Sequence, residues 1–206
     1  MITVKLIAVT QPLDGKTPEE FLASIGRLCY KSQRTDSPGD FLRRRIEEGH
    51  ESIIEHLAFT FHISGISRVC SHQLVRHRIA SYTQVSQRYV DHSNAVFTTP
   101  ESFAHSGEAW RAWNEFLGRA KKLYRFLLEH SVKREDARFV LPQAVTTEII
   151  VTMNARELRH FFKLRCSPRA QWEIRLLAKK MLKLAYEVAP NLFQDLCEKY
   201  IGALVE

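Results

Sequence analysis

A strict alternation of apolar residues in LAFTFHI (57–63) constrains the fold of this chain more than any other local pattern. Every second position carries a large apolar side chain: Leu57, Phe59, Phe61 and Ile63. Successive side chains of a β-strand point to opposite faces of the sheet, so these four would share one face. The pattern predicts a strand with one buried face and with the smaller or polar residues on the other.

Strand and helix patterns alternate along the rest of the chain. Residues 2–9 and 144–153 are rich in β-branched and apolar side chains, which predicts two more strands. Helices are expected where apolar residues recur at helical spacing or where capping residues open a segment. These segments are 17–30, 41–49, 66–76, 108–130, 154–165 and 168–188. Residues 92–107 are expected to form a loop. The fold class that follows is mixed α/β.

Residue types at the helix starts support these boundaries. Thr17 precedes a proline and two glutamates, and Asn154 stands three residues before Glu157, which is the spacing of a capping box. Ser167 and Pro168 are expected to end one helix and begin the next. The last of these helices would turn one apolar stripe to the core: Leu177, Met181, Leu184, Ala185 and Val188.

Length and composition limit the class of protein. A chain of 206 residues, 45% of them hydrophobic, can bury a sizeable core. One domain covering residues 1–206 is predicted, although this length also allows two small lobes. The four cysteines are widely spaced and form no Cys-x-x-Cys pair, which favours reduced thiols in a cytoplasmic protein. We expect neither a signal peptide nor a membrane partner, because no apolar run approaches the roughly 20 residues that span a bilayer.

Several common catalytic and cofactor motifs are missing from the sequence. His50 and His56 are six residues apart, about 240° around a helix, so they cannot chelate a metal from one helical face. We therefore predict no metal site. The glycine-rich loops of Rossmann and Walker A sites and the nucleophile elbow of serine hydrolases are also absent.

The stretch RHRIASYTQVSQRY (76–89) combines three basic side chains with hydroxyl, amide and aromatic groups. Arginine binds phosphate bidentately, and tyrosine offers a flat surface for rings. A second basic group follows later in the chain: Arg138, Arg156, His160, Arg165 and Arg169. The two groups could face one cleft and bind phosphorylated, planar ligands. The alternatives are a solvated basic turn and a nucleic-acid-binding module, which the net charge of +7 favours.

The same stretch resembles the signature of flavin-dependent thymidylate synthases, written as Arg-His-Arg, seven residues, then Ser. Here the signature is Arg76-His77-Arg78, residues 79–85 and Ser86. Further segments resemble the family in the same order along the chain: GHESIIEH (49–56), FTFHI (59–63), ARFVLP (137–142), VTMNARELRHFFKLR (151–165) and RAQWEIR (169–175). The resemblance covers nearly the whole chain. A chance match of one motif would not explain several matching segments in the same order.

The resemblance implies an activity, cofactors and an assembly. The expected reaction is the reductive methylation of dUMP to dTMP, with 5,10-methylenetetrahydrofolate as carbon donor. FAD that NADPH has reduced would supply the hydride. The implied fold is a single domain with a β-sheet flanked by helices, assembled as a homotetramer with active sites shared between subunits. Under this interpretation nucleic acid is not a partner. A related protein that keeps the fold without catalysis is also disfavoured, because the Arg-His-Arg motif and Arg165 are intact.

Site residues can be carried over position by position. The resemblance implies that dUMP contacts Gln73, Arg76, Gln84, Val85, Ser86, Gln87, Arg88, Arg138 and Arg165. It implies that FAD contacts Ser52, Glu55, Arg76, His77, Arg78, Gln84, Asn154, Arg156 and His160. Arg165 is the expected catalytic residue, because a permanently charged guanidinium can stabilise negative charge on uracil N3 and O2. Ser86 is expected to bind the nucleotide and not to attack it.

Five positions depart from residues that are common in the family. Gln84 replaces a glutamate found in some members, and a neutral amide cannot act as a base. The others are Thr83 for Asn or Ser, Cys29 for Ser, His160 for Asn and Arg169 for His. These changes could alter flavin affinity or oxygen reactivity, but they leave the positive charge of the expected site in place.

Overall fold

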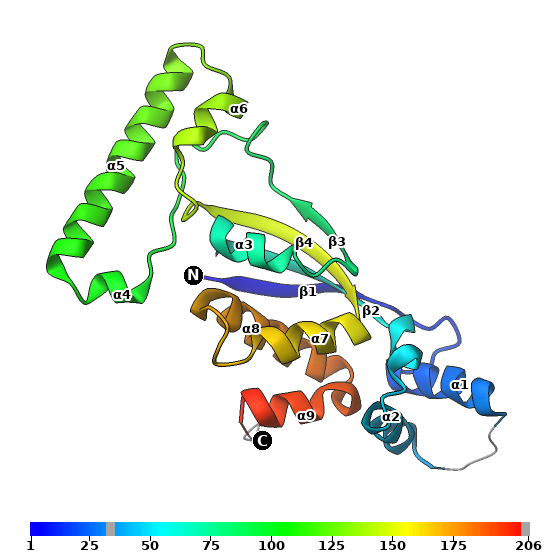
Figure 1. Cartoon of the computed structure of the whole chain (residues 1–206). Coiled ribbons are helices and arrows are strands. Elements are labelled where there is room, and N and C mark those ends of the chain that lie inside the picture. The colour runs from blue at the N-terminus through cyan, green and yellow to red at the C-terminus, as the bar shows by residue number, and fades with distance from the viewer. Residues whose placement is uncertain (32–35, 203–206) are drawn as a thin grey trace. The chain divides into compact units, whose positions relative to one another are not determined.

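The computed structural model describes residues 1–31 and 36–202, and their strands form one four-stranded sheet (Figure 1). The strands are β1 (Thr3–Val9), β2 (Ala58–Ser67), β3 (Ala80–Gln84) and β4 (Thr146–Asn154). Their order across the sheet is β1-β2-β4-β3. The three predicted strands are confirmed, with ends shifted by a few residues. β3 lies inside the basic stretch 76–89, where no strand was predicted.

Hydrogen bonds define the antiparallel register of the sheet. The Thr10 N–H donates to the Ala58 carbonyl at 2.9 Å, and the Thr60 and Thr152 hydroxyls lie 2.9 Å apart. On the other side of β4, the Val85 N–H donates to the Glu148 carbonyl at 3.0 Å. Contacts pass from Thr10–Ala58 to Met1–Gly65 between β1 and β2, and from Thr60–Thr152 to Arg68–Val145 between β2 and β4. Residue numbers rise along one strand as they fall along the other, so these strands run in opposite directions.

The chain divides into two compact units. The first contains Met1–Thr3, Ile63–Leu74 and Thr83–Ile149, and the second contains Val4–His62, Val75–Tyr82 and Ile150–Glu206. The prediction of one domain over residues 1–206 therefore stays a prediction, and we describe each unit by itself.

The alternating segment at 57–63 has the buried face that its sequence predicts. Leu57, Phe59, Phe61 and Ile63 have no exposed surface. β2 continues beyond this segment to Ser67, so Ile66 belongs to the strand and not to the following helix as predicted. Gly65 permits this extension: its φ is +74°, and a Cβ there would lie 2.5 Å from the Met1 carbonyl oxygen. A larger residue would push the strands apart.

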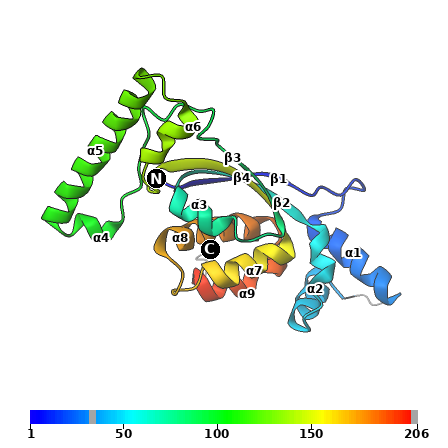
Figure 2. The same ribbon diagram turned by 45° about the horizontal axis from the view of Figure 1, so that its top comes forward.

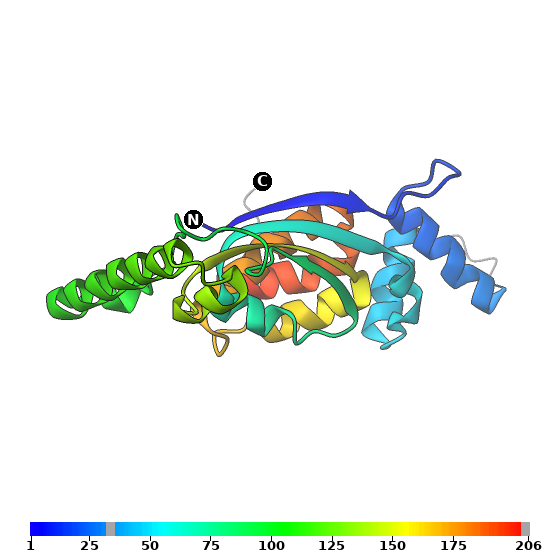
Figure 3. The same cartoon turned by 90° about the horizontal axis from the view of Figure 1, so that it is seen from above.

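Some helices of the second unit lie against one side of its strands (Figures 2 and 3). Its helices are α1 (Pro18–Tyr30), α2 (Pro38–Glu47), the 3₁₀ helix η1 (Glu51–His56), α7 (Ala155–Arg165), α8 (Trp172–Val188) and α9 (Pro190–Tyr200). Figures 2 and 3 show α7, α8 and α9 on one side of the sheet, and the Phe59 ring packs edge-on against Phe193 of α9 with centroids 5.8 Å apart. α9 was not predicted, although Pro190 and the spacing of its buried Leu192, Phe193 and Leu196 mark it.

Only some of the helix caps and helix starts predicted from the sequence form in the second unit. Thr17 and Glu20 form the reciprocal capping box of α1. Asn154 caps α7 by accepting a hydrogen bond from the Glu157 N–H at 2.9 Å, but the Glu157 carboxylate contacts a histidine. α8 begins at Trp172, capped by Gln171, and not at Pro168 as predicted. Two residues of its predicted core stripe, Leu184 and Val188, are only half-buried.

The first unit contains the expected long helix, α5 (Gly107–Glu129). Its other helices are α3 (Arg68–Leu74), α4 (Glu101–Ala104), α6 (Arg134–Ala137) and the 3₁₀ helix η2 (Arg138–Val140). α5 packs through Tyr124, which is fully buried and whose hydroxyl accepts a hydrogen bond from the His92 N–H at 3.2 Å. The predicted loop 92–107 contains α4, and its Phe97 forms a β-bridge with Val145.

The cysteines and the membrane prediction can be compared with the structure directly. Cys29 is exposed, Cys70, Cys166 and Cys197 are buried, and all four are free thiols. Burial raises the pKa of Cys166 to about 12 and that of Cys197 to about 11, so these two thiols stay protonated at neutral pH. None of the helices in the described part of the chain is long and apolar enough to cross a bilayer.

We expect the buried face of β2 to carry much of the stability. Phe59→Ala should lower the free energy of unfolding by about 3–5 kcal/mol, because it removes a fully buried ring and leaves a cavity. Phe139→Ala is the matched control, since that ring is 82% exposed and should change the free energy by less than about 0.5 kcal/mol. Urea unfolding followed by circular dichroism measures both variants, and equal losses would contradict this role of β2.

Candidate functional site

A cavity of about 510 Å³ in the second unit contains several of the predicted flavin residues. It lies beside η1 and the first turns of α7, and it is lined by Glu51, Glu55, Ile79, Asn154, Arg156, Glu157, His160 and Lys163. Four of these residues are among the nine FAD contacts that the family resemblance implies: Glu55, Asn154, Arg156 and His160. The fold thus brings residues about 100 positions apart in the sequence to one cavity.

Ion pairs at the rim of this cavity hold its charged side chains. Arg156 pairs closely with Glu55, and this carboxylate raises the pKa of the guanidinium. Lys163 lies 3.3 Å from a Glu51 carboxylate oxygen. About half of the Arg156 side chain is exposed, so its ion pair contributes little to folding and can be exchanged for an anionic ligand at small cost.

His77 of the Arg-His-Arg motif is buried in the second unit, only 5% exposed. Its Nδ1 lies 3.2 Å from a Glu157 carboxylate oxygen, and the Arg165 Nε–H donates to its Nε2 at 3.1 Å. The Phe161 ring packs edge-on against the imidazole with centroids 4.9 Å apart. Burial and the charges of Arg165 and His160 lower the pKa of His77 to about 4, so the ring is neutral near pH 7.

Glu157 completes this buried group, and the sequence did not identify it as a site residue. It is 7% exposed, and burial raises the pKa of its carboxyl group. From the sequence it was interpreted as a capping residue of α7. Its contact with His77 joins residues 80 positions apart, so only the tertiary fold could assign it.

His77, Glu157 and His160 also have the donor types of a metal site. One ligand atom from each lies within 4.8 Å of the others, and the described residues contain no second group of this kind. The spacing of His50 and His56, on which the prediction of no metal rested, does not address this group. The guanidinium beside His77 Nε2 adds a positive charge that disfavours a cation there, so we assign the group to a hydrogen-bond network.

Three other predicted flavin residues are exposed in the second unit. Ser52 is exposed in η1, and Arg76 and Arg78 are exposed in the turn that leads to β3. This turn is anchored by the Tyr82 hydroxyl, which donates to the His77 carbonyl at 2.7 Å. Arg76 does not belong to the preceding helix, because α3 ends at Leu74. The remaining predicted FAD residue, Gln84, lies in the first unit.

Most predicted dUMP residues lie in the first unit. Gln84 ends β3 and its amide nitrogen donates to the Thr147 hydroxyl at 3.2 Å. The turn after it contains Val85, Ser86, Gln87 and Arg88, and the Ser86 hydroxyl accepts a hydrogen bond from the Arg88 N–H at 3.2 Å. Gln73 is half-buried on α3. Arg76 and Arg165 belong to the second unit. That the two basic groups of the sequence share one cleft therefore remains a prediction.

Two arginines of the first unit donate to Glu135, and the charge of one of them acts on a third arginine. Arg88 donates through Nε to Glu135 at 3.0 Å, and Arg138 donates to the Glu135 backbone carbonyl at 3.0 Å. Arg68, which the sequence did not place in the site, donates to the Val85 carbonyl at 3.1 Å, and its buried Nε has no hydrogen-bond partner among the described residues. Burial and the charge of Arg138 lower the pKa of Arg68. The excess of positive charge favours an anionic ligand.

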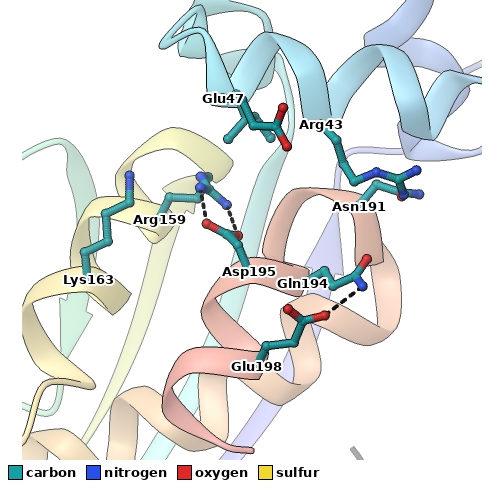
Figure 4. Close-up of a pocket in the computed structure, with 9 residues that line it drawn as sticks. Arg43, Glu47, Arg159, Lys163, Asn191, Gln194, Asp195 and Glu198 are labelled. Carbon is teal, nitrogen blue, oxygen red and sulfur yellow. Dashed lines mark hydrogen bonds and ion pairs between the residues drawn. The ribbon is translucent and has the colours of Figure 1, made fainter. Parts of the chain in front are cut away.

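A second cavity of about 610 Å³ lies between α2, α7 and α9 and contains none of the predicted site residues (Figure 4). The buried Arg159 makes two 2.8 Å hydrogen bonds to Asp195, and Gln194 donates to Glu198 at 2.8 Å. Arg43 donates to Asn191 across the same space. Acidic and basic side chains are balanced and paired here, so this cavity does not select an anionic or a cationic ligand.

Comparisons with known proteins agree with this arrangement. The family model described as thymidylate synthase complementing protein matches residues 5–191. A flavin-dependent thymidylate synthase of Geobacter sulfurreducens is 50% identical over 189 residues, which cover 86% of this chain and 82% of that protein. Relatives of the same name from Pyrococcus furiosus and Clostridium tetani are 49% and 40% identical, covering 89% and 94% of this chain and 78% and 86% of theirs. The chain belongs to the family of flavin-dependent thymidylate synthases.

Proposed function

We propose that this protein converts dUMP to dTMP by reductive methylation, with FAD as its cofactor. The cavity at the start of α7 carries the proposal, because it gathers Glu55, Asn154, Arg156 and His160 at the positions where the family binds flavin. The relatives' name, flavin-dependent thymidylate synthase, supports both the flavin and the product. We further propose methylenetetrahydrofolate as the carbon donor and NADPH as the reductant.

The residues of the cavity suit a dinucleotide cofactor. Arg156 and Lys163 supply positive charge for a pyrophosphate, and Asn154 and His160 supply polar groups for ring and ribose atoms. Ile79 adds an apolar side chain for a planar ring. When bound, the flavin supplies the hydride for the methyl group, which is chemistry that protein side chains lack. The chain itself binds and orients the reactants.

The arginine group of the first unit suits the phosphate of dUMP. Arg88 and Arg138 are both positions that the resemblance assigns to the nucleotide, and Arg68 adds a third positive charge beside Arg138. Glu135 holds Arg88 in the absence of an anion. A phosphate dianion that replaces this carboxylate would accept bidentate, charge-assisted hydrogen bonds from the same guanidinium.

Arg165 is the residue that we propose activates the pyrimidine. Uracil C5 becomes nucleophilic only as negative charge develops over N3 and O2, and a guanidinium that stays charged at working pH stabilises that charge. Its Nε is held by His77, which sets the orientation of the guanidinium plane. Ser86 would bind the nucleotide without covalent attack, and its hydroxyl also accepts a hydrogen bond from the Arg88 N–H.

Assembly and location follow the family. We propose a homotetramer with shared active sites in the cytoplasm. The first unit offers a surface for assembly, since Phe116, Leu123 and Phe126 of α5 are 48%, 45% and 51% exposed. Aromatic and aliphatic side chains in this number are common at subunit interfaces. The free thiols of the four cysteines suit a reducing compartment.

We expect the purified protein to be yellow and to form dTMP from dUMP, methylenetetrahydrofolate and NADPH. Reduced flavin should be reoxidised without oxygen only when both dUMP and methylenetetrahydrofolate are present. Product identification by mass spectrometry is the measurement. Flavin-free protein that forms no dTMP after FAD is added would refute the enzyme proposal. Binding to DNA or RNA that falls steeply with salt would then favour the nucleic-acid alternative.

Arg165→Lys should lower kcat for dTMP formation by about 10²–10³ and change the Kd of FAD by less than about threefold. A point charge cannot reproduce the planar guanidinium that we propose stabilises the transition state. Arg175→Lys on α8 is the control in the same unit, because Arg175 donates to a backbone carbonyl outside the site. Stopped-flow kinetics and flavin fluorescence measure the two effects, and equal losses of turnover and FAD affinity would indicate a structural role.

The proposed site depends on a neutral His77, so acid should weaken the fold. The folded pKa, about 4, lies below the unfolded value of about 6.5, and the unfolded state therefore binds more protons between these values. His77 contributes stability above pH 6.5 that is lost as the pH falls towards 4, by up to about 1.4 kcal/mol per unit. Urea unfolding of the ligand-free protein at pH 7, 6 and 5 measures this slope.

The comparison variants for this experiment are His77→Asn and His105→Asn. His77→Asn should reduce the dependence of unfolding free energy on pH, whatever its stability at pH 7. His105 is exposed, so His105→Asn should keep the slope of the wild-type protein. A His77→Asn slope equal to that of the wild type would show that His77 is not the group whose protonation destabilises the fold.

A further inference from the structure

The side chains of Glu157, His77 and Arg165 form a continuous chain of contacts, in which Glu157 and His77 are buried and Arg165 is half-buried. Glu157 and Arg165 are both on α7, eight residues and about 12 Å apart along the helix axis, and the His77 ring lies between them. The carboxylate faces one ring nitrogen at 3.2 Å, and the guanidinium Nε–H donates to the other at 3.1 Å. His77 and Glu157 are 5% and 7% exposed, so water has little access to these contacts.

The donor and acceptor types determine where the proton of His77 lies. Arginine Nε carries a hydrogen and cannot accept, so His77 Nε2 must offer its lone pair. A neutral imidazole then carries its proton on Nδ1, where the Glu157 carboxylate accepts it. The other tautomer would place two N–H donors opposite each other, at Nε2 and at Arg165 Nε, and would leave Nδ1 without a donor for the carboxylate to accept.

We infer that Glu157 is a positioning residue: it keeps His77 in the Nδ1–H tautomer and thereby holds the guanidinium of Arg165 in its reactive orientation. This inference rests on the function proposed above for Arg165. Glu157 also lines the cavity proposed for FAD, but in this role it acts through its contact with His77. A carboxylate orients a histidine here as it does in the catalytic triad of serine proteases, but the group that the histidine positions is an arginine.

The surroundings of His77 support this assignment. Three charged or titratable side chains of α7 face the ring: Glu157, His160 and Arg165. The Phe161 ring fixes the plane of the imidazole, and the Tyr82 hydroxyl fixes its backbone from β3. With the ring held in place, the tautomer is the variable that decides whether Nε2 can accept from Arg165.

The tautomer can be measured without any enzymatic activity. In flavin-free protein labelled with ¹⁵N-histidine, long-range ¹H–¹⁵N spectra at pH 7 should show His77 with its proton on Nδ1, assigned by its loss in His77→Asn. In Glu157→Leu the His77 signals should move to the Nε2–H pattern or to a mixture. An Nε2–H pattern in the wild-type protein overturns the inference.

Kinetics test the consequence for Arg165. Glu157→Leu should lower kcat for dTMP formation by about 10- to 100-fold, as for other residues that orient a functional histidine, with KM for dUMP changed by less than about threefold. Glu157→Asp keeps a carboxylate and should recover both the Nδ1–H tautomer and most of kcat. Glu173→Leu is the matched control, since Glu173 is a buried glutamate of α8 in the same unit and should leave the tautomer unchanged.

The outcomes separate this inference from the proposed function. If the wild-type protein makes no dTMP, the proposed function is refuted. The tautomer of His77 still tests whether the Glu157 carboxylate accepts the Nδ1 proton. A protein that makes dTMP, in which Glu157→Leu changes the tautomer but not kcat, overturns the positioning role. If Glu157→Leu does not fold, Glu157→Asp and the wild-type spectrum decide: an Nε2–H pattern in either with full kcat overturns the inference.

Discussion

The structure depends first on the burial of one face of β2. In the second unit, Phe59 and Phe61 have no exposed surface, and Phe59 packs against Phe193, which in turn packs against Phe162 of α7. A fully buried side chain of this size contributes about 1.5–3 kcal/mol. This packing places α7 against the strands, and α7 carries most of the charged groups of the candidate site. The apolar core of the second unit therefore determines where its polar chemistry lies.

Buried charge in the second unit is tolerated because it is paired. Arg159, 2% exposed, makes two hydrogen bonds to Asp195, and Glu157 contacts a neutral His77. An unpaired charge at either position would cost several kcal/mol. The two networks differ in consequence. The Arg159 pair ties α7 to α9, whereas the His77 network leads to Arg165 and thus to the proposed reaction.

Local patterns predicted most of the secondary structure, and they failed where tertiary contacts override them. The alternation at 57–63 and the caps at Thr17 and Asn154 depend on neighbouring residues, so the sequence is sufficient for them. β2 extends to Ser67 because Gly65 lets the strand approach Met1, which no local pattern shows. Likewise Glu157 has the spacing of a capping residue, but its carboxylate contacts a histidine 80 positions away. The resemblance to a family identified residues of the cavity at α7, but not Lys163 or Glu157 of that cavity, nor Arg68 of the first unit.

The sequence by itself determined the mixed α and β composition, the apolar face of β2 and the family to which the chain belongs, because each is encoded in residue types at short or ordered spacing. Only the tertiary structure decided which charged groups meet. Glu55 reaches Arg156, and His77 reaches both Glu157 and Arg165, because helix packing brings distant segments within hydrogen-bond distance. The pKa of His77 falls for the same reason: desolvation and neighbouring charge belong to a place in the fold, and a residue type does not specify them.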